Sequence, residues 1–438
     1  MLKEFIKYVS LNVLSMLGVS VYVLCDTFFI ANGIGTDALS GLNLVLPFFA
    51  FICAVGIMLG SGTAIRYSIL CGQNRFEEAR KTIFHGSITA LILGVLISIF
   101  GFIYTNPIAE LMGADKTLMK YATDYISVIF MFAWALIINQ LFMCLTRAAG
   151  FPKIAMIAGL VSSFSNLFLD IIFIYHCKWG NWGAAFASGL APCFAIIIQF
   201  YYFIFYRKIF KFEVAKLNLK KIIDICCLGF PSFVTEISTG VVMTCFNFKI
   251  LELSGNIGIA AYSIIANIAI VVAAMFTGVA QGIQPLISLN FGAGKKEAVH
   301  QVSRYAYITT TLMSISAYLL FYIFSKEIIN VFNSSNNLAL TSLADTGLKV
   351  YYLCLVFMGA NTVTTSILAS KAKSFKSFLL SLCRAILFVI PLLYLLSYLF
   401  GIIGVWATIP VTEFITMLIF LFGNTHISKD SGTVTVTK

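Results

Sequence analysis

Long apolar segments separated by short polar breaks recur along almost the whole chain. A helix needs about 20 apolar residues to cross a bilayer, and hydropathy identifies twelve segments close to that length. They lie at about residues 10–32, 44–68, 86–105, 121–144, 154–175, 183–206, 223–250, 258–287, 305–325, 345–369, 378–398 and 401–423. The pattern predicts an all-α polytopic membrane protein with twelve transmembrane helices.

The positions of the basic residues predict the orientation in the membrane. Of the 29 Lys and Arg residues, 21 lie at the N-terminus, in alternate loops and in the tail, and six lie in the intervening loops. Basic residues favour cytoplasmic loops, so we expect both termini in the cytoplasm and a location in the plasma (inner) membrane. Residues Met1 to Lys7 lead into the first segment without an A-x-A-like site, so we expect no cleaved signal peptide.

The composition excludes several classes of protein. Hydrophobic residues make up 60% of the chain and charged residues 11%, whereas soluble domains average roughly a quarter charged residues. A basic cytoplasmic rim explains the net charge of +11, so we expect no nucleic acid partner. The sequence has no H-E-x-x-H, G-x-S-x-G or phosphate-loop pattern. We therefore expect no enzyme, no cofactor and no direct use of ATP. The eleven cysteines are scattered and mostly lie within apolar segments, where they are expected as small buried hydrophobes.

Several short patterns recur at about half the length of the chain. The pattern around Gly72 returns at Gly292, and the pattern around Gly183 returns at Gly404. This spacing predicts a tandem duplication of six spans, which gives two six-helix bundles related by a pseudo-two-fold axis along the membrane normal. The predicted divisions are an N-terminal lobe at 1–206, a cytoplasmic linker at 207–222, a C-terminal lobe at 223–424 and a cytoplasmic tail at 425–438. Two lobes around a cleft are typical of a transporter, and no filter motif indicates a channel.

Two carboxylates stand out at membrane depth in the first half. Asp170 follows Asn166 by four residues, and Asp26 follows Tyr22 by four, so each pair shares a helix face. Asp26 is about 9 Å from the outer end of its helix, and Asp170 has nearly the same depth. A carboxylate in a span costs about 2.5 to 3.5 kcal/mol and usually faces a bundle interior or an aqueous cavity. A capping or packing hydrogen bond is the structural alternative.

Acidic residues also occur within the second half. Glu236 is about fifteen residues beyond Lys221, or roughly 22 Å along a helix, and is either a negative charge in a substrate cleft or one member of a packing pair. For Glu413 and Arg384 we favour a structural contact between the last two spans, with snorkelling of Arg384 as the alternative.

Together these residues resemble the multidrug and toxic compound extrusion (MATE) family over about residues 10–424. The resemblance lies in Tyr22-x-x-x-Asp26, Gly35-Thr-Asp37-Ala38-Leu39, the segment from Gly60 to Ala79, Ala149-Gly150-Phe151-Pro152-Lys153, Asn166-x-x-x-Asp170, Gly183-Ala184-Ala185, and Gln281-Gly-Ile-Gln284-Pro285 to Gly294. The overall pattern is most similar to that of the smaller multidrug exporters of Gram-positive type.

The resemblance implies export of organic, often cationic, compounds driven by inward flow of H⁺ or Na⁺. It places the coupling site at Asp26, Asn166 and Asp170, with a hydroxyl at Ser188 where the family pattern has threonine. The proposed lining of the substrate cleft is Tyr22, Glu236, Gln281 and Gln284.

The resulting hypothesis is a cation antiporter that exports amphipathic cationic compounds by alternating access. Two adjacent carboxyls can hold a proton, or can bind Na⁺ with help from the Asn166 amide, and the sequence does not choose between these ions. Membrane lipids surround the protein, and we expect a monomer. The alternative is a flippase for a lipid-linked precursor, which should line its cleft with Arg or Lys. A structural scaffold is disfavoured by the buried carboxylates.

Overall fold

The chain forms a helical membrane protein in which every regular element of the described residues is a helix. The structure, a computed structural model, describes residues 1–34, 36–112, 118–203, 215–332 and 337–427. The helices are α1 (Leu2–Gly33), α2 (Thr36–Gly72), α3 (Phe76–Ile103), α4 (Thr105–Leu111), α5 (Met119–Met131), α6 (Ala133–Ala148), α7 (Pro152–Asp170), η1 (Ile171–His176), α8 (Gly180–Tyr201), α9 (Leu219–Gly292), α10 (Lys296–Ile323), α11 (Ser325–Phe332), α12 (Leu338–Tyr351), η3 (Tyr352–Cys354), α13 (Leu355–Ser370), α14 (Ser374–Leu382), η4 (Cys383–Leu387) and α15 (Val389–Ile427).

Two of these helices are too long to be single membrane spans. Within the described residues, nine helices are long and apolar enough to cross a membrane, and the bent pair α5–α6 makes a tenth. Helix α9 has 74 residues, which would extend roughly 110 Å, against a hydrocarbon core of about 30 Å. It is broken at Gly255, and α15 is broken at Gly401, each with a φ near +60° that favours glycine.

The helices of the second half follow those of the first in order and length. Helices α3 and α10 both have 28 residues, and the offset between their first residues equals the offset between Gly72 and Gly292. The turns before them close in the same way, because Arg75 N–H donates to Leu70 O and Lys295 N–H donates to Asn290 O, both at 2.9 Å. These repeats in the structure have the spacing of the repeats in the sequence.

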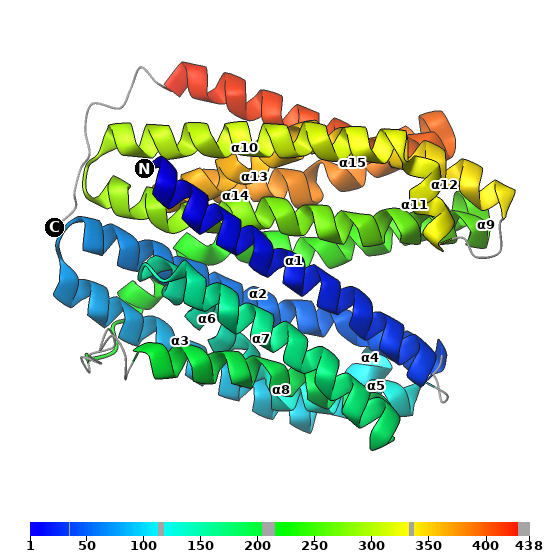
Figure 1. Ribbon diagram of the computed structural model, residues 1–438, viewed down its shortest axis with the longest axis horizontal. Coiled ribbons are helices and arrows are strands. Elements are labelled where there is room, and N and C mark those ends of the chain that lie inside the picture. The colour runs from blue at the N-terminus through cyan, green and yellow to red at the C-terminus, as the bar shows by residue number, and fades with distance from the viewer. Residues whose placement is uncertain (35, 113–117, 204–214, 333–336, 428–438) are drawn as a thin grey trace.

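The two groups of helices have separate cores. Figure 1 shows α2–α8 on one side of the molecule and α9–α15 on the other, with α1 between them. One buried cluster contains Ile52 and Ile126 from the first group, and another contains Phe246 and Trp406 from the second. Each group therefore has an apolar cluster of its own, and a third cluster joins α1 to α9 and α10.

Glycines bring the two halves into close contact along α2 and α9. We call Gly62, Gly72, Gly229 and Gly292 the glycine seam. A Cβ on Gly229 would lie 1.8 Å from Met58 O, and a Cβ on Gly62 would lie 2.0 Å from Ile225 O. Without a hydrophobic force between helices in lipid, small residues that let backbones approach are a main source of packing.

The same contact includes an ion pair. Arg66 of α2 lies 3.2 Å from Asp224 of α9, measured from Nε to Oδ2. Both side chains are partly exposed, so the pair is worth less than about 1 kcal/mol. The guanidinium of Arg66 therefore joins the two halves.

Candidate functional site

The two aspartates of the first half lie in contact with each other. Asp170 is the last residue of α7 and is fully buried, and Asp26 lies on α1 with 9% of its surface exposed. Their carboxyl groups lie close enough to interact directly, in agreement with their nearly equal predicted depth. Two carboxyls in contact can share one proton.

Asn166 connects Asp170 to helix α8. With the amide nitrogen facing Asp170 Oδ2 at 3.2 Å, its oxygen accepts from Ser188 Oγ at 3.1 Å and from Ser188 N–H at 3.2 Å. The opposite amide orientation keeps only a contact with Ser188 Oγ, so the first orientation satisfies more groups. The structure thus joins all four residues predicted for the coupling site, Asp26, Asn166, Asp170 and Ser188.

The backbone changes its winding directly after Asp170. Residues Ile171–His176 form a π-helix, closed by a hydrogen bond from Cys177 N–H to Ile172 O at 2.8 Å. Single π-helical turns are rare and occur frequently at functional sites. The wider turn begins at the carboxylate itself, which marks this end of α7 as a specialised position.

Two tyrosines complete the surroundings of the pair. Tyr22 lies one turn before Asp26, and its phenol is close enough to interact electrostatically with both carboxyls. Tyr125 of α5 does the same and also forms a hydrogen bond with Ser188. Tyr22 was predicted, whereas Tyr125 was missed, because no polar residue four positions away distinguishes it from the other aromatic residues of its span.

One oxygen of each aspartate stands out by its lack of a hydrogen-bond donor among the described residues. Asp26 Oδ1 and Asp170 Oδ1 are buried and lack a hydrogen-bond partner among the described residues. Buried polar atoms are normally satisfied, so these two oxygens are candidates for an exchangeable proton or a small cation. In the described part of the chain no group of three His, Cys, Asp or Glu side chains could hold a metal ion. A cation here would be held by two carboxylates and neutral oxygens.

Glu236 is linked to this cluster across the two halves. It lies on α9, and its charge acts on the Cys53 thiol of α2. Cys53 in turn interacts with Tyr22 and forms a hydrogen bond with Gln140. Tyr22 and Cys53 of the first half therefore link the aspartate pair to Glu236 of the second.

Gln281 and Gln284, the other two residues predicted for the cleft, lie elsewhere. They flank Gly282, whose Cβ would be 3.0 Å from Val9 Cα of α1. Along α1, the distance from Val9 to Asp26 is roughly 25 Å. The glutamines therefore lie near the contact between α1 and α9 and not beside the aspartates, although Gln281 Oε1 is also buried without a partner among the described residues.

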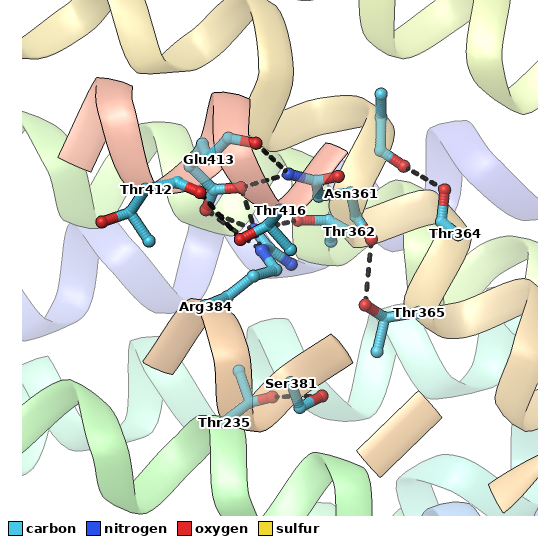
Figure 2. A network of polar contacts seen from close by, with 11 residues as sticks. Thr235, Asn361, Thr362, Thr364, Thr365, Ser381, Arg384, Thr412, Glu413 and Thr416 are labelled. Atoms are coloured by element: carbon cyan, nitrogen blue, oxygen red, sulfur yellow. Dashed lines mark hydrogen bonds and ion pairs between the residues drawn. The ribbon is translucent and has the colours of Figure 1, made fainter. Parts of the chain in front are cut away.

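The predicted contact between Arg384 and Glu413 is confirmed. Figure 2 shows the guanidinium against the carboxylate, and Arg384 Nη2 lies 2.8 Å from Glu413 Oε1. The pair joins η4 to α15 within the second half.

Comparison with known proteins identifies the family. The MatE family model matches residues 12–172 and again 231–395. The multidrug export protein MepA of Staphylococcus saprophyticus subsp. saprophyticus is 26% identical over 402 residues, covering 91% of this chain and 88% of that protein. MepA of Staphylococcus aureus strain MRSA252 is 23% identical over 398 residues, covering 90% and 86%.

Solved structures have the same fold. A multidrug resistance MATE family transporter of the MOP superfamily, in its outward-facing conformation, matches with a TM-score of 0.92 at 23% identity and covers 98% of this chain and 97% of its own. A MOP superfamily transporter from Pyrococcus furiosus matches with a TM-score of 0.88 at 23% identity and the same coverage. The chain belongs to the MatE family and has the fold of the MATE transporters.

Proposed function

We propose that this protein is a secondary active exporter of amphipathic, often cationic, organic compounds, driven by the inward flow of a cation. The observation that carries the proposal is the buried pair Asp26–Asp170, with one free oxygen on each carboxyl. Burying two carboxylates at membrane depth costs free energy, so residues of this kind usually have a functional role. The relatives described as multidrug export proteins support the substrate class.

The proposed architecture is twelve spans in two six-helix lobes, at 1–206 and 223–424. Counting α9 and α15 as two spans each brings the ten apolar spans to twelve. The two matches of the family model begin half the chain length apart, which supports the tandem repeat. Half of the proposed linker at 207–222 and most of the proposed cytoplasmic tail at 425–438 lie outside the described residues. We place the protein, as a monomer, in the plasma membrane with both termini in the cytoplasm.

In the proposed mechanism, cation binding at the aspartate pair is transmitted through α1. A bound cation neutralises the pair and draws α1 towards α7. The first part of α1 packs on α9, because a Cβ on Gly278 would be 2.6 Å from Val13 Cα. A displacement at Asp26 therefore reaches the other half where α1 packs on α9, and alternating access requires α2 and α9 to separate at the glycine seam.

The geometry favours H⁺ over Na⁺ as the coupling ion. Two carboxyls in contact can share a proton, and the Asn166 oxygen is occupied by Ser188. Na⁺ at Asp26, Asn166 and Asp170 would have to replace the shared proton and turn the amide around. The site has enough oxygen ligands for Na⁺, so the experiment below compares the two ions.

For the substrate we propose a site beside Glu236, lined by aromatic faces from both halves. Phe233 lies three residues before Glu236, and its ring centroid is 6.3 Å from that of Phe51 on α2. A ring face attracts an organic cation, by about 2 kcal/mol or more when the site is dry. Tyr22 borders the same region, and Gln281 and Gln284 would meet the substrate nearer the seam.

A lipid-linked precursor flippase fits these contacts less well. Such a protein needs basic side chains that are free to meet an anionic head group. Three basic residues near membrane depth are each in an ion pair: Arg66 with Asp224, Lys249 with Glu252, and Arg384 with Glu413. We therefore favour the exporter.

The direct test is efflux of a fluorescent cationic dye from cells that express the protein, compared with cells that carry an empty vector. We expect efflux that stops when the proton gradient is collapsed and continues when Na⁺ is replaced by K⁺. Loss of efflux with K⁺ alone would identify Na⁺ as the coupling ion. Equal dye retention with and without the protein, for several cationic dyes, would contradict the proposed function.

Replacing Tyr125 by Phe should weaken cation coupling without abolishing it. The change removes only the hydroxyl that bonds to Ser188, and one such bond is worth about 0.5 to 1.5 kcal/mol, or roughly a two- to tenfold change in affinity. The measurement is the cation concentration that gives half-maximal efflux. The control is Tyr121→Phe, one turn earlier on the same helix; an equal shift in both variants would show that Tyr125 has no specific role.

A further inference from the structure

A second buried charged cluster lies in the second half, apart from the aspartate pair. Arg384 is 13% exposed and Glu413 is 7% exposed. Arg384 Nη2 donates to Glu413 Oε1 at 2.8 Å, and Arg384 Nε donates to Oε2 at 3.0 Å. This two-point contact is the strong form of an ion pair. It occupies both carboxylate oxygens (Figure 2).

An amide and a hydroxyl complete this cluster. Asn361 Nδ2 donates to Glu413 Oε2 at 2.6 Å and to Glu413 O at 2.9 Å. Arg384 Nη2 also donates to Thr362 Oγ1 at 3.1 Å. The other titratable groups that interact with the pair, among the described residues, are the Cys354 thiol and the Tyr351 phenol. The cluster has one carboxylate and one guanidinium, and therefore no net charge.

The helices that carry the two clusters correspond to each other. Helices α7 and α14 begin at nearly equivalent positions of the two halves and both pass into a π-helix, α7 after 19 residues into η1 and α14 after 9 residues into η4. Arg384 therefore lies about 12 Å nearer the start of its helix than Asp170 does, on the corresponding helix but at a different depth. The turns before them close with the same bond, from Phe151 N–H to Thr146 O at 3.0 Å and from Lys373 N–H to Leu368 O at 2.9 Å. Asp170 lies directly before the first π-helix, and Arg384 lies within the second.

The two clusters also use the same kinds of ligand. Each contains a carboxylate, an amide and a hydroxyl, which come from Asp170, Asn166 and Ser188 in the first half. The first cluster has a second carboxylate and two free oxygens. In the second, a guanidinium that is charged at any physiological pH lies against the carboxylate.

We propose that Arg384 is a tethered cation that permanently closes a cation-accepting site in the second half. It neutralises Glu413 as an exchangeable H⁺ or Na⁺ would neutralise the aspartate pair, so only the first half exchanges an ion. Arg384 is thus a positioning residue for Glu413 and a determinant of how many cations are coupled to each substrate. The statement about the number of coupled cations rests on the proposed function, whereas the existence of the closed site does not.

The test measures cation binding without transport. Thermal unfolding of the purified protein is followed in detergent while Na⁺ replaces K⁺ at constant ionic strength, and separately while the pH is lowered. A ligand that binds the folded state raises the midpoint. In the Asp170→Asn variant the first site is disabled. We expect its unfolding midpoint to show no dependence on Na⁺ or pH that involves Glu413.

Adding Arg384→Gln to Asp170→Asn should open the second site. The midpoint should then rise by a few degrees with Na⁺ or with falling pH, and adding Glu413→Gln should remove that rise. The Arg384→Lys variant keeps the positive charge, so its unfolding midpoint should respond to Na⁺ and pH as it does with Arg384 in place. If Arg384→Gln does not fold, Asn361→Asp adds one carboxylate to the intact pair and should gain the same cation dependence.

Two results would overturn the inference. One is a folded Arg384→Gln variant, or a folded Asn361→Asp variant, whose midpoint does not respond to Na⁺ or pH. The other is a Glu413-dependent response in Asp170→Asn with Arg384 in place. Absence of dye efflux by the unmodified protein would instead contradict the proposed function, and would leave the result of the unfolding experiment to stand by itself.

Discussion

Replacing Asp170 by Asn should abolish cation-driven export while leaving the protein folded. The new amide is nearly the same size, but it cannot share a proton with Asp26 or present an anionic oxygen to a cation. Hydrogen bonds to charged groups are worth about 1.5 to 3 kcal/mol, or roughly a ten- to 150-fold loss of cation affinity. The measurement is the initial rate of dye efflux at matched amounts of protein in the membrane.

The control for this change is Asp124→Asn, the same substitution at a carboxylate of α5 that forms no part of the aspartate pair. We expect Asp124→Asn to export dye at the unmodified rate, and Asp170→Asn to show the same elution profile and an unfolding midpoint within a few degrees. Normal export by Asp170→Asn would remove Asp170 from the coupling site. Equal loss in both variants would indicate a general sensitivity to lost charge.

The residues of the aspartate pair could be predicted because they obey local rules. Asp26 and Asp170 are charges in apolar segments, and each has a polar residue four positions earlier on the same helix face. Counting residues to the helix ends then placed both at one depth. The structure adds the contact between them, which no rule of spacing within a single helix could give.

Other features depended on contacts between distant segments. Tyr125 joins the site only because α5 packs beside α8, where its hydroxyl meets Ser188. Gln281 and Gln284 carry the resemblance to the family, yet they lie roughly 25 Å along α1 from Asp26. The sequence predicted a boundary between spans at about 250–258 and another at 398–401, and the backbone leaves the helical conformation at Gly255 and Gly401, at or beside these boundaries.

The geometry suggests a division of roles between the halves. The first half holds a pair of carboxyls with free oxygens, and the second holds a carboxylate already neutralised by Arg384. Helix α1 belongs to the first half but packs along α9 through Gly278 and Gly282. An ion bound at Asp26 can therefore act on the contact between the halves without a second exchanging site.

The contact between the halves should be highly sensitive to one added methyl group at Gly229. In Gly229→Ala, the Cβ would lie 1.8 Å from Met58 O and 2.7 Å from Met58 C. Those are backbone atoms, which cannot rotate away as a side chain can, so α2 and α9 must move apart. Overpacking of this kind costs about 1 to 3 kcal/mol, and each 1.4 kcal/mol changes a conformational ratio about tenfold. We expect dye efflux to fall roughly tenfold or more.

The matched control is Gly240→Ala on the same helix, where a Cβ would meet no atom within 4 Å. Alanine favours a helix over glycine by about 1 kcal/mol, so that variant should be at least as stable and should export normally.

Opening of the glycine seam can be followed through Cys226, which neighbours Ile225 at the contact with Gly62. The measurement is the alkylation rate of Cys226 in a Cys227→Ser background. Faster alkylation in Gly229→Ala alone would show that the halves have separated. Equal rates in both variants, with efflux unchanged, would mean that close packing at the seam is not needed for transport, and the path from Asp26 through α1 to α9 would then have to act elsewhere.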